Sequence, residues 1–479
     1  MKRHKQIQSP LLKLCASLML GIAIAHHTAL STSVLPLLIA TLLLVWWTRR
    51  RPLVQSILIC ALFFETGLLA ESAQRNPPTP PFGGAGGWGA FSPPVGGAGG
   101  GFEAVVMSEP AEKPKTLMMD LLLPALGETR RCYIWKDSLS RQLALGDALL
   151  VELHDERFVR WDGWQRGGHG LSRLSRLQWV RLKALLLRHR LLSRYRQLNI
   201  GDEQYAVLAA MTLGDKSALT NELRQTYSVT GTSHILALSG LHLGIIYFLM
   251  ASIMGRRRRA WLPQTLLMLS IWAYAFLTGL SPGVVRSATM LTVYTIFAIG
   301  GRSRMSLNVL CFTAIVMLLV NAQSLFDVSF QLSFASVFAI LLFMPLFESL
   351  LTPDFHFRRP MLGRLWSLGA VSLAAQLGTA PLTAYYFGSF PTYFLLTNYI
   401  AIPAATVILY GALLTLLFPP ASLLLVWVVK FLNFALDHAA RLPMASIDDL
   451  RPTVLQVALT YVVIACFYLL LAKLFGRRS

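Results

Sequence analysis

Long apolar runs separated by short polar turns dominate two regions of the sequence. The first region holds three runs, at about 11–27, 33–48 and 53–71. The second region holds nine runs, at about 233–254, 261–279, 283–300, 306–321, 327–348, 366–386, 393–417, 419–437 and 454–475. An apolar helix of about 20 residues crosses a bilayer. The pattern therefore predicts a polytopic α-helical membrane protein with about 12 transmembrane helices.

Between these regions, residues 102–165 follow a different pattern. Short runs of strand-forming residues alternate there with turn residues, which is typical of a small all-β domain. The turn Leu145-Gly146-Asp147 and the run after it fit the closing part of an OB-like barrel. We therefore predict a small extracytoplasmic OB-like domain inserted after the third helix. An irregular β domain without a ligand is the alternative.

Residues 171–200 are unusually basic and contain no acidic residue. Leucine, tryptophan and tyrosine recur between the basic residues at helical spacing, which predicts an amphipathic helix on a membrane surface. Its cationic positions, which we take as candidates for DNA contact, are Arg173, Arg176, Arg181, Lys183, Arg188, Arg190, Arg194 and Arg196. Two interpretations stay open: the helix binds anionic lipid head groups, or it contacts phosphates of a nucleic-acid strand.

These patterns divide the chain into five segments. They are N-terminal membrane helices (1–71), a Pro/Gly-rich linker (72–101), the OB-like domain (102–165), the basic amphipathic helix (171–200) and a transmembrane channel domain (201–479). The last segment is predicted to begin with a short amphipathic helix at about 202–213 and a capped helix from Asn221.

Composition agrees with a membrane protein and adds an orientation. Of the 479 residues, 54% are hydrophobic and only 14% are charged, against roughly 25% charged in soluble domains. The net charge of +20 lies partly in short turns, at Arg256–Arg259, Arg302/Arg304, Arg358–Arg364 and Arg477/Arg478. If basic turns face the cytoplasm, both termini are cytoplasmic and the β domain lies outside. The five cysteines have no metal-ligand spacing, so we expect no metal and no cofactor.

Candidate chemistry concentrates in the stretch 227–244, where His234, Ser239 and His242 begin an apolar run. Polar side chains inside a membrane span usually face a cavity or a partner helix. Ser239 and His242 are three residues apart and would meet on one helix face, but no acidic residue lies nearby to orient the histidine. Helix packing, a substrate path and a Ser–His hydrolase are the three interpretations.

Further polar positions lie in later spans. Arg286 follows a Pro/Gly turn, Gln331 follows the predicted helix cap Asp327, and Asn398 lies in the apolar run 393–417. Charges and amides at membrane depth need a partner or water, so we take these residues as candidates for lining a channel. We also expect Pro381 and Pro403 to break their helices.

The motifs that carry these residues resemble the ComEC family of competence proteins. The resemblance rests on GTSHILALSGLHLG (231–244), preceded by GDKSALTNELRQTYSVT, and on later runs in the family's order. Those runs are SPGVVRSATM (281–290), DVSFQLSFAS (327–336) and TAPLTAYYFGSFPTYFLLTNYIAIP (379–403). The resemblance covers residues from about 200 to the end of the sequence and, more loosely, the N-terminal region.

The resemblance implies a channel that passes single-stranded DNA across the bacterial inner membrane during natural transformation. A competence DNA receptor or pilus would supply the strand, a helicase-type motor in the cytoplasm would pull it, and membrane lipids and a second copy of the chain are further expected partners. Longer family members continue into a metallo-β-lactamase-like domain, whereas no HxHxDH pattern occurs here. We therefore expect a short form without enzymatic activity. The alternatives are a transporter of another anionic solute or lipid precursor, and an intramembrane hydrolase using Ser239 and His242.

Overall fold

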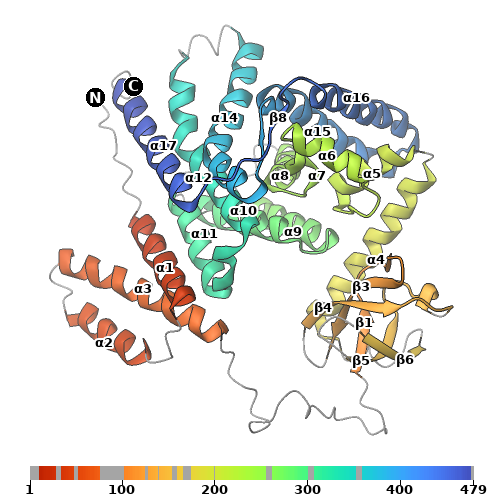
Figure 1. Ribbon diagram of the computed structural model, residues 1–479, viewed down its shortest axis with the longest axis horizontal. Coiled ribbons are helices and arrows are strands. Elements are labelled where there is room, and N and C mark those ends of the chain that lie inside the picture. The colour runs from red at the N-terminus through yellow and green to blue at the C-terminus, as the bar shows by residue number, and fades with distance from the viewer. Residues whose placement is uncertain are drawn as a thin grey trace.

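The computed structural model describes twelve stretches of the chain, and helices dominate them (Figure 1). These stretches are residues 10–28, 34–47, 52–75, 102–124, 128–138, 140–153, 159–165, 174–198, 200–254, 261–299, 307–351 and 359–475. Arg173, most of the predicted linker and the basic turns at 256–259, 302–304 and 477–478 lie outside the described residues. The orientation inferred from those turns therefore stays a prediction.

Three N-terminal helices, α1 (Pro10–His27), α2 (Val34–Trp47) and α3 (Pro52–Arg75), form from the first three apolar runs. Helix α3 continues four residues beyond the predicted end of this segment. Helices α1 and α3 cross at two glycines: a Cβ added at Gly21 would lie 2.1 Å from the Phe64 carbonyl oxygen, and one at Gly67 would lie 2.4 Å from the Leu18 carbonyl oxygen. The crossing requires residues without side chains, as is common for close helix pairs in membranes.

Replacing Gly67 with alanine should therefore push α1 away from α3. Overpacking of this kind typically costs about 1–3 kcal/mol, which we expect as a lower free energy of unfolding in detergent. Gly244→Ala is the matched control, because a Cβ there meets nothing within 4 Å. Equal stability of the two variants would contradict the close crossing.

The β region consists of β1 (Phe102–Val106), β2 (Ala111–Glu112), β3 (Thr116–Leu123), β4 (Glu128–Trp135), β5 (Ala148–Leu153) and β6 (Val159–Gln165). All pairs are antiparallel: β1 lies between β3 and β5, β4 pairs with β3, and β6 pairs with β5. Strands β4 and β6 also contact each other, so the sheet curls. A small β region is thus present, and its assignment as an OB-like barrel stays a prediction.

Alternation along the strands gives this sheet two buried faces. Strand β3 places Leu117, Met119 and Leu121 on the inside of the curl. On the other face of the sheet, Val105 of β1 and Leu122 of β3 pack against α4 (Arg176–Gln197). Farther along α4, Leu192 and Tyr195 pack into the helical bundle. Part of the apolar surface of the basic helix is therefore buried against protein, whereas the sequence predicted a helix lying on the membrane.

The helical bundle follows α4 (Figure 1). Its helices are α5 (Asp202–Leu213), α6 (Asn221–Val229), α7 (Ser233–Leu236), α8 (Gly240–Met254), α9 (Trp261–Leu277), α10 (Pro282–Ile299), α11 (Leu307–Val320), η4 (Ala322–Phe326), α12 (Val328–Ser349), α14 (Pro360–Phe387), α15 (Phe394–Leu417), η5 (Pro419–Ala421), α16 (Ser422–Ala440) and α17 (Val454–Phe475). A two-stranded ladder joins β7 (Phe390–Pro391) to β8 (Ser446–Ile447).

Within the described residues, five helical segments are long and apolar enough to cross a membrane. They are Val54–Ser72, Val328–Ser349, Phe394–Leu417, Pro419–Ala440 and Val454–Leu474. Four shorter apolar helices cover Leu11–His27, Gly240–Met254, Trp261–Leu277 and Leu307–Val320. The chain is accordingly a multi-pass membrane protein, while the predicted number of about 12 spans stays a prediction.

Three local predictions were wrong. The run 233–254 is two helices, because the chain is extended at Ala237. Helices α14 and α15 continue through Pro381 and Pro403, since side chains nearby compensate for carbonyls freed in membrane helices. Next to the Leu377 carbonyl that Pro381 leaves free, the Tyr461 hydroxyl donates to the Gly378 carbonyl at 2.8 Å. Helix α5 is not amphipathic, because every residue from Tyr205 to Leu213 is buried.

Candidate functional site

The break between α7 and α8 is the centre of the candidate site. The Ser239 amide donates to His242 Nδ1 at 3.4 Å, and Ser239 Oγ lies 3.3 Å from the same nitrogen. This side chain to backbone bond competes with the helix and favours its interruption. His242 is fully buried. Because Nδ1 accepts from the amide, a neutral ring carries its proton on Nε2, which has no hydrogen-bond partner among the described residues.

The first turn of α10 packs directly on this break. A Cβ added at Gly283 would lie 2.9 Å from the Leu238 carbonyl oxygen, and one at Gly240 would lie 3.1 Å from Ser287 Oγ. The glycines on both sides permit this approach of two backbones. Consequently, Arg286, one turn along α10, lies on the helix that covers the break.

Arg286 joins α10 to the start of α12. Its side chain is largely buried, and Nη1 donates to Ser329 Oγ at 3.1 Å and lies 3.8 Å from Asp327 Oδ2. Asp327 caps α12, as predicted, by accepting from the Ser329 amide, and it also accepts from Ser329 Oγ at 2.7 Å. The side chain of Asp327 is 47% exposed, so the guanidinium is held between a buried helix face and a solvated carboxylate.

Gln331 extends this polar chain of contacts to α14. Its Nε2 donates to the Leu325 carbonyl at 2.9 Å, and its Oε1 accepts from the Tyr386 hydroxyl at 2.8 Å. The polar contacts thus run from Arg286 of α10 through α12 to Tyr386 of α14, and the break that holds Ser239 and His242 joins them by packing of α8 on α10.

Asn398 lies beside the start of the stretch 227–244, on α15, and His234 lies within the stretch on α7. Thr397 Oγ1 donates to the Thr230 carbonyl at 2.8 Å, which places its neighbour Asn398 beside the start of the stretch. Asn398 is buried, and its Oδ1 has no partner among the described residues. His234 Nδ1 lies 3.1 Å from the Gly231 carbonyl oxygen. No hydrogen bond in the described part of the chain joins either residue to the other four candidates.

The pair Ser239 and His242 lacks the third member of a hydrolase triad. A catalytic serine needs a histidine that is oriented by a further group, usually a carboxylate. The remaining ring nitrogen of His242 contacts no carboxylate within the residues that the structure describes. Nor do those residues contain a group of three or more His, Cys, Asp or Glu side chains that could hold a metal ion.

The basic helix α4 separates its cations into two sets. One set is exposed and recurs at helical spacing on one face; it consists of Arg176, Lys183, Arg190 and Arg194. We call these four residues the basic face. Trp179 lies beside them, with the Lys183 ammonium 5.0 Å from its ring centre. The basic face is free to meet a polyanion.

The other described cations of α4 contact protein, although Arg196 is also exposed. Arg181 Nη1 donates to Thr129 Oγ1 of β4 at 3.4 Å, and Arg196 Nε donates to the Tyr205 hydroxyl at 3.1 Å. Burial lowers the pKa of Arg188, and the charges of Asp215 and Glu109 oppose this shift. Half-buried Arg181 and Arg188 thus lie at a joint between the β region and the bundle, and the predicted contact of these three residues with DNA stays a prediction.

A comparison with known protein families decides the identity of the bundle. Residues 211–474 match the family described as "Competence protein", and this range contains all six predicted channel residues. The chain belongs to the competence protein family. The resemblance to ComEC proteins seen in the sequence is thereby confirmed.

Relatives of this competence-family chain differ in length. It is 31% identical to ComE operon protein 3 of Bacillus subtilis over 247 residues, which cover 51% of the chain and 30% of that protein. An uncharacterized protein of Aquifex aeolicus is 30% identical over 244 residues, covering 50% and 55% of the two chains. The uncharacterized protein YcaI of Escherichia coli is 28% identical over 214 residues, covering 42% and 28%. The matched stretch therefore spans between about a quarter and a half of these relatives, and no solved structure matches.

Several residues of the site were not recognised as functional in the sequence. The partner of Arg286 is one: Asp327 was predicted only as a helix cap, because it lies 41 positions away and pairing across helices leaves no local signal. Outside the site, the buried carboxylates Glu65 and Glu71 on α3 were not singled out either. Their signal was present, since an acidic residue inside an apolar run indicates a specific partner.

Proposed function

We propose that this competence-family protein takes part in DNA uptake during natural transformation by passing single-stranded DNA across the bacterial inner membrane. Family membership implies the role in DNA uptake. The observation that carries the finer proposal is the polar chain of contacts through α10, α12 and α14, with the break before α8 packed on α10. It lies entirely inside the matched residues 211–474 and inside helices that are otherwise apolar.

Unpaired polar atoms support a path rather than a packing seam. Buried polar atoms in proteins almost always have a partner, yet His242 Nε2, Arg286 Nε and Asn398 Oδ1 are buried without one among the described residues. Two of the three atoms carry a proton to donate. The two donors are the imidazole of His242 and the guanidinium of Arg286, and such groups match the oxygen atoms of a phosphodiester backbone.

The β region and α4 would receive the strand on the outer side. Cationic side chains neutralise phosphates, and aromatic rings stack on bases without sequence preference. The basic face and Trp179 offer both kinds of contact on one helix. We assign the β region as the OB-like domain of this entrance and place it outside the cytoplasm, with both termini of the chain inside.

Several parts of the proposal concern other molecules. A competence DNA receptor or pilus would deliver the strand, and a helicase-type motor would pull it. Lipids would surround the bundle, and a second copy of the chain would be a further partner. In this proposal Ser239 and His242 line the path and catalyse no reaction.

Deletion of the gene in a naturally transformable host tests the function. We expect transformation with chromosomal DNA to be lost and to return when the full chain is supplied from a plasmid, while labelled DNA still binds to the cell surface. Normal entry of labelled DNA into the cytoplasm of the deletion strain would overturn the proposal. That result would favour transport of another anionic solute, which Arg286 would also suit.

A further inference from the structure

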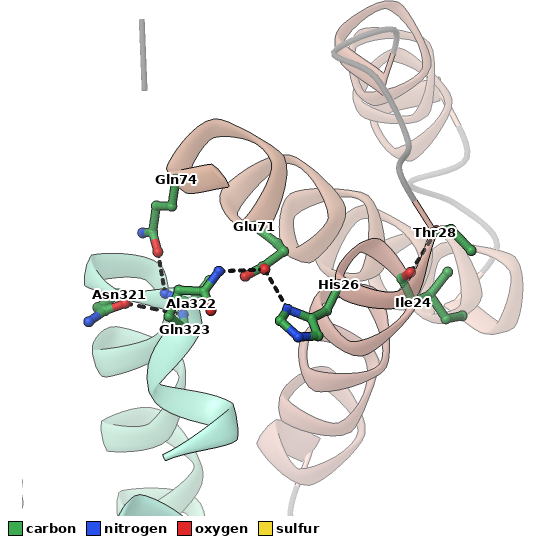
Figure 2. Close-up of polar contacts among 8 residues, drawn as sticks. All are labelled: Ile24, His26, Thr28, Glu71, Gln74, Asn321, Ala322 and Gln323. Atoms are coloured by element: carbon green, nitrogen blue, oxygen red, sulfur yellow. Dashed lines mark hydrogen bonds and ion pairs between the residues drawn. The ribbon is translucent and has the colours of Figure 1, made fainter. Parts of the chain in front are cut away.

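A polar cluster fastens the N-terminal helices to the bundle (Figure 2). At its centre is Glu71 of α3, whose side chain is fully buried. One carboxylate oxygen, Oε1, lies 2.9 Å from His26 Nδ1 of α1 and accepts from Gln323 Nε2 of η4 at 2.6 Å. An ionisable group at membrane depth is costly unless it makes specific contacts. Glu71 makes its contacts with two different parts of the chain, which stabilises their junction.

Gln74, one turn farther along α3, adds two more hydrogen bonds between α3 and the bundle. Its Nε2 donates to the Val320 carbonyl at 3.2 Å, and its Oε1 accepts from the Ala322 amide at 2.8 Å. The ring of His26 stacks on Phe326, with 4.0 Å between ring centres. Together these contacts hold η4 at its first two residues and at its last residue, and all three contacting side chains lie outside the residues that match the competence family.

The held segment leads directly into the candidate site. Asp327 follows η4, and its amide donates to the Ser324 carbonyl at 3.1 Å. Gln331 donates to the Leu325 carbonyl at 2.9 Å. Two members of the polar chain are therefore bonded to η4. Since Asp327 and Ser329 hold the guanidinium of Arg286, a shift of η4 changes the position of that charge.

We infer that Glu71 is a positioning residue for the Arg286–Asp327 pair: by holding Gln323 and His26, it fixes η4 and thereby the cation of the proposed DNA path. This inference rests on the proposed function for its biological meaning. Its structural part, that Glu71 orders the segment 322–331, holds independently of what passes through the protein.

The same helix offers a matched control. Glu65 is also a buried carboxylate of α3, but it accepts from Thr41 of α2 at 2.8 Å and makes no hydrogen bond with η4 among the described residues. Replacing either carboxylate with alanine removes a buried acceptor. Only Glu71→Ala removes one that η4 uses. Glu71→Gln is the conservative variant, since an amide oxygen accepts the same two hydrogen bonds.

Hydrogen exchange of the full chain in lipid nanodiscs tests the structural part. We expect Glu71→Ala to raise amide exchange of residues 322–331 by about tenfold, because one hydrogen bond contributes a free energy equal to roughly a tenfold ratio. Glu71→Gln should restore slow exchange, and Glu65→Ala should leave this segment unchanged. Wild-type exchange of 322–331 in Glu71→Ala, or an equal increase in Glu65→Ala, would overturn the inference whether or not the protein carries DNA.

Transformation frequency then tests the connection to Arg286. Effects of residues that act through one another do not add, so Glu71→Ala should cause little further loss when Arg286→Gln is already present. Glu65→Ala combined with Arg286→Gln should multiply the separate effects. If Glu71→Ala also multiplies with Arg286→Gln, Glu71 does not act through this pair. If Arg286→Gln alone transforms normally, the proposed path fails, and the exchange result still decides the role of Glu71.

Discussion

Replacing Arg286 with glutamine is expected to lower transformation frequency by about 10- to 100-fold, since a hydrogen bond to a charged group contributes about 1.5–3 kcal/mol. The bundle should still assemble. Glutamine retains a donor for Ser329, and Asp327 is half exposed, so its carboxylate keeps water after the cation is lost. The measurement is the number of transformants at saturating DNA, with the amount of protein in the membrane fraction determined by immunoblotting.

Two further variants make this result specific. Arg286→Lys keeps the charge but loses the planar fork of donors, and we expect an intermediate frequency. Arg441→Gln is a control for loss of charge alone, because Arg441 is exposed on α16 and pairs only one turn away, with Asp437 at 2.7 Å. Wild-type transformation by Arg286→Gln, at a normal protein level, would remove Arg286 from the path.

Replacing the four residues of the basic face with glutamine is expected to weaken binding of single-stranded DNA and to reduce its salt dependence. Each phosphate contact with a single strand contributes about 0.7 to the slope of log K against log salt. Loss of four contacts should therefore lower the magnitude of the slope by about 3. Binding is measured by fluorescence anisotropy with the full chain in nanodiscs of uncharged lipid, which excludes attraction of the DNA to the lipid head groups.

The control also replaces cations of α4 with glutamine, but at positions outside the basic face. Arg181→Gln combined with Arg188→Gln removes two half-buried cations, of which Arg181 donates to Thr129, and we expect the slope to stay within experimental error of wild type. An unchanged slope in the variant lacking the basic face would show that DNA does not use it. Weaker association of that variant with anionic vesicles would then identify α4 as a lipid-binding helix.

The helices and the β region could be predicted because their signals are local. An apolar run that is long enough to cross a bilayer indicates a membrane helix. The alternation of buried and exposed residues in β3 follows from the pleat of a strand. The cap at Asp327 was equally local. For the same reason the motif around His242 allowed the family to be recognised before any geometry was known.

The remaining features depend on contacts between distant residues. A helix interruption at Ala237–Ser239 has no proline or paired glycines as its signal, and it reflects the bond from the Ser239 amide to His242. Pro381 and Pro403 gave the opposite error: each predicted a helix break, but α14 and α15 continue through them. Likewise, a helical wheel of α4 places Arg188 and Arg190 on different faces, and only the packing of the β region and α9 shows which of these faces is exposed.

The unbroken helix α4 has a mechanical consequence. It contains 22 residues and so measures about 33 Å at 1.5 Å per residue. Its first half is bonded to the sheet through Leu182 and Leu185, and its second half is anchored in the bundle through Leu192 and Tyr195. A stiff rod held at both ends transmits torque. A tilt of the sheet therefore turns α5 and α15, which border the stretch 227–244. Under the proposed function, tension on a strand held by the β region would reach these helices through α4.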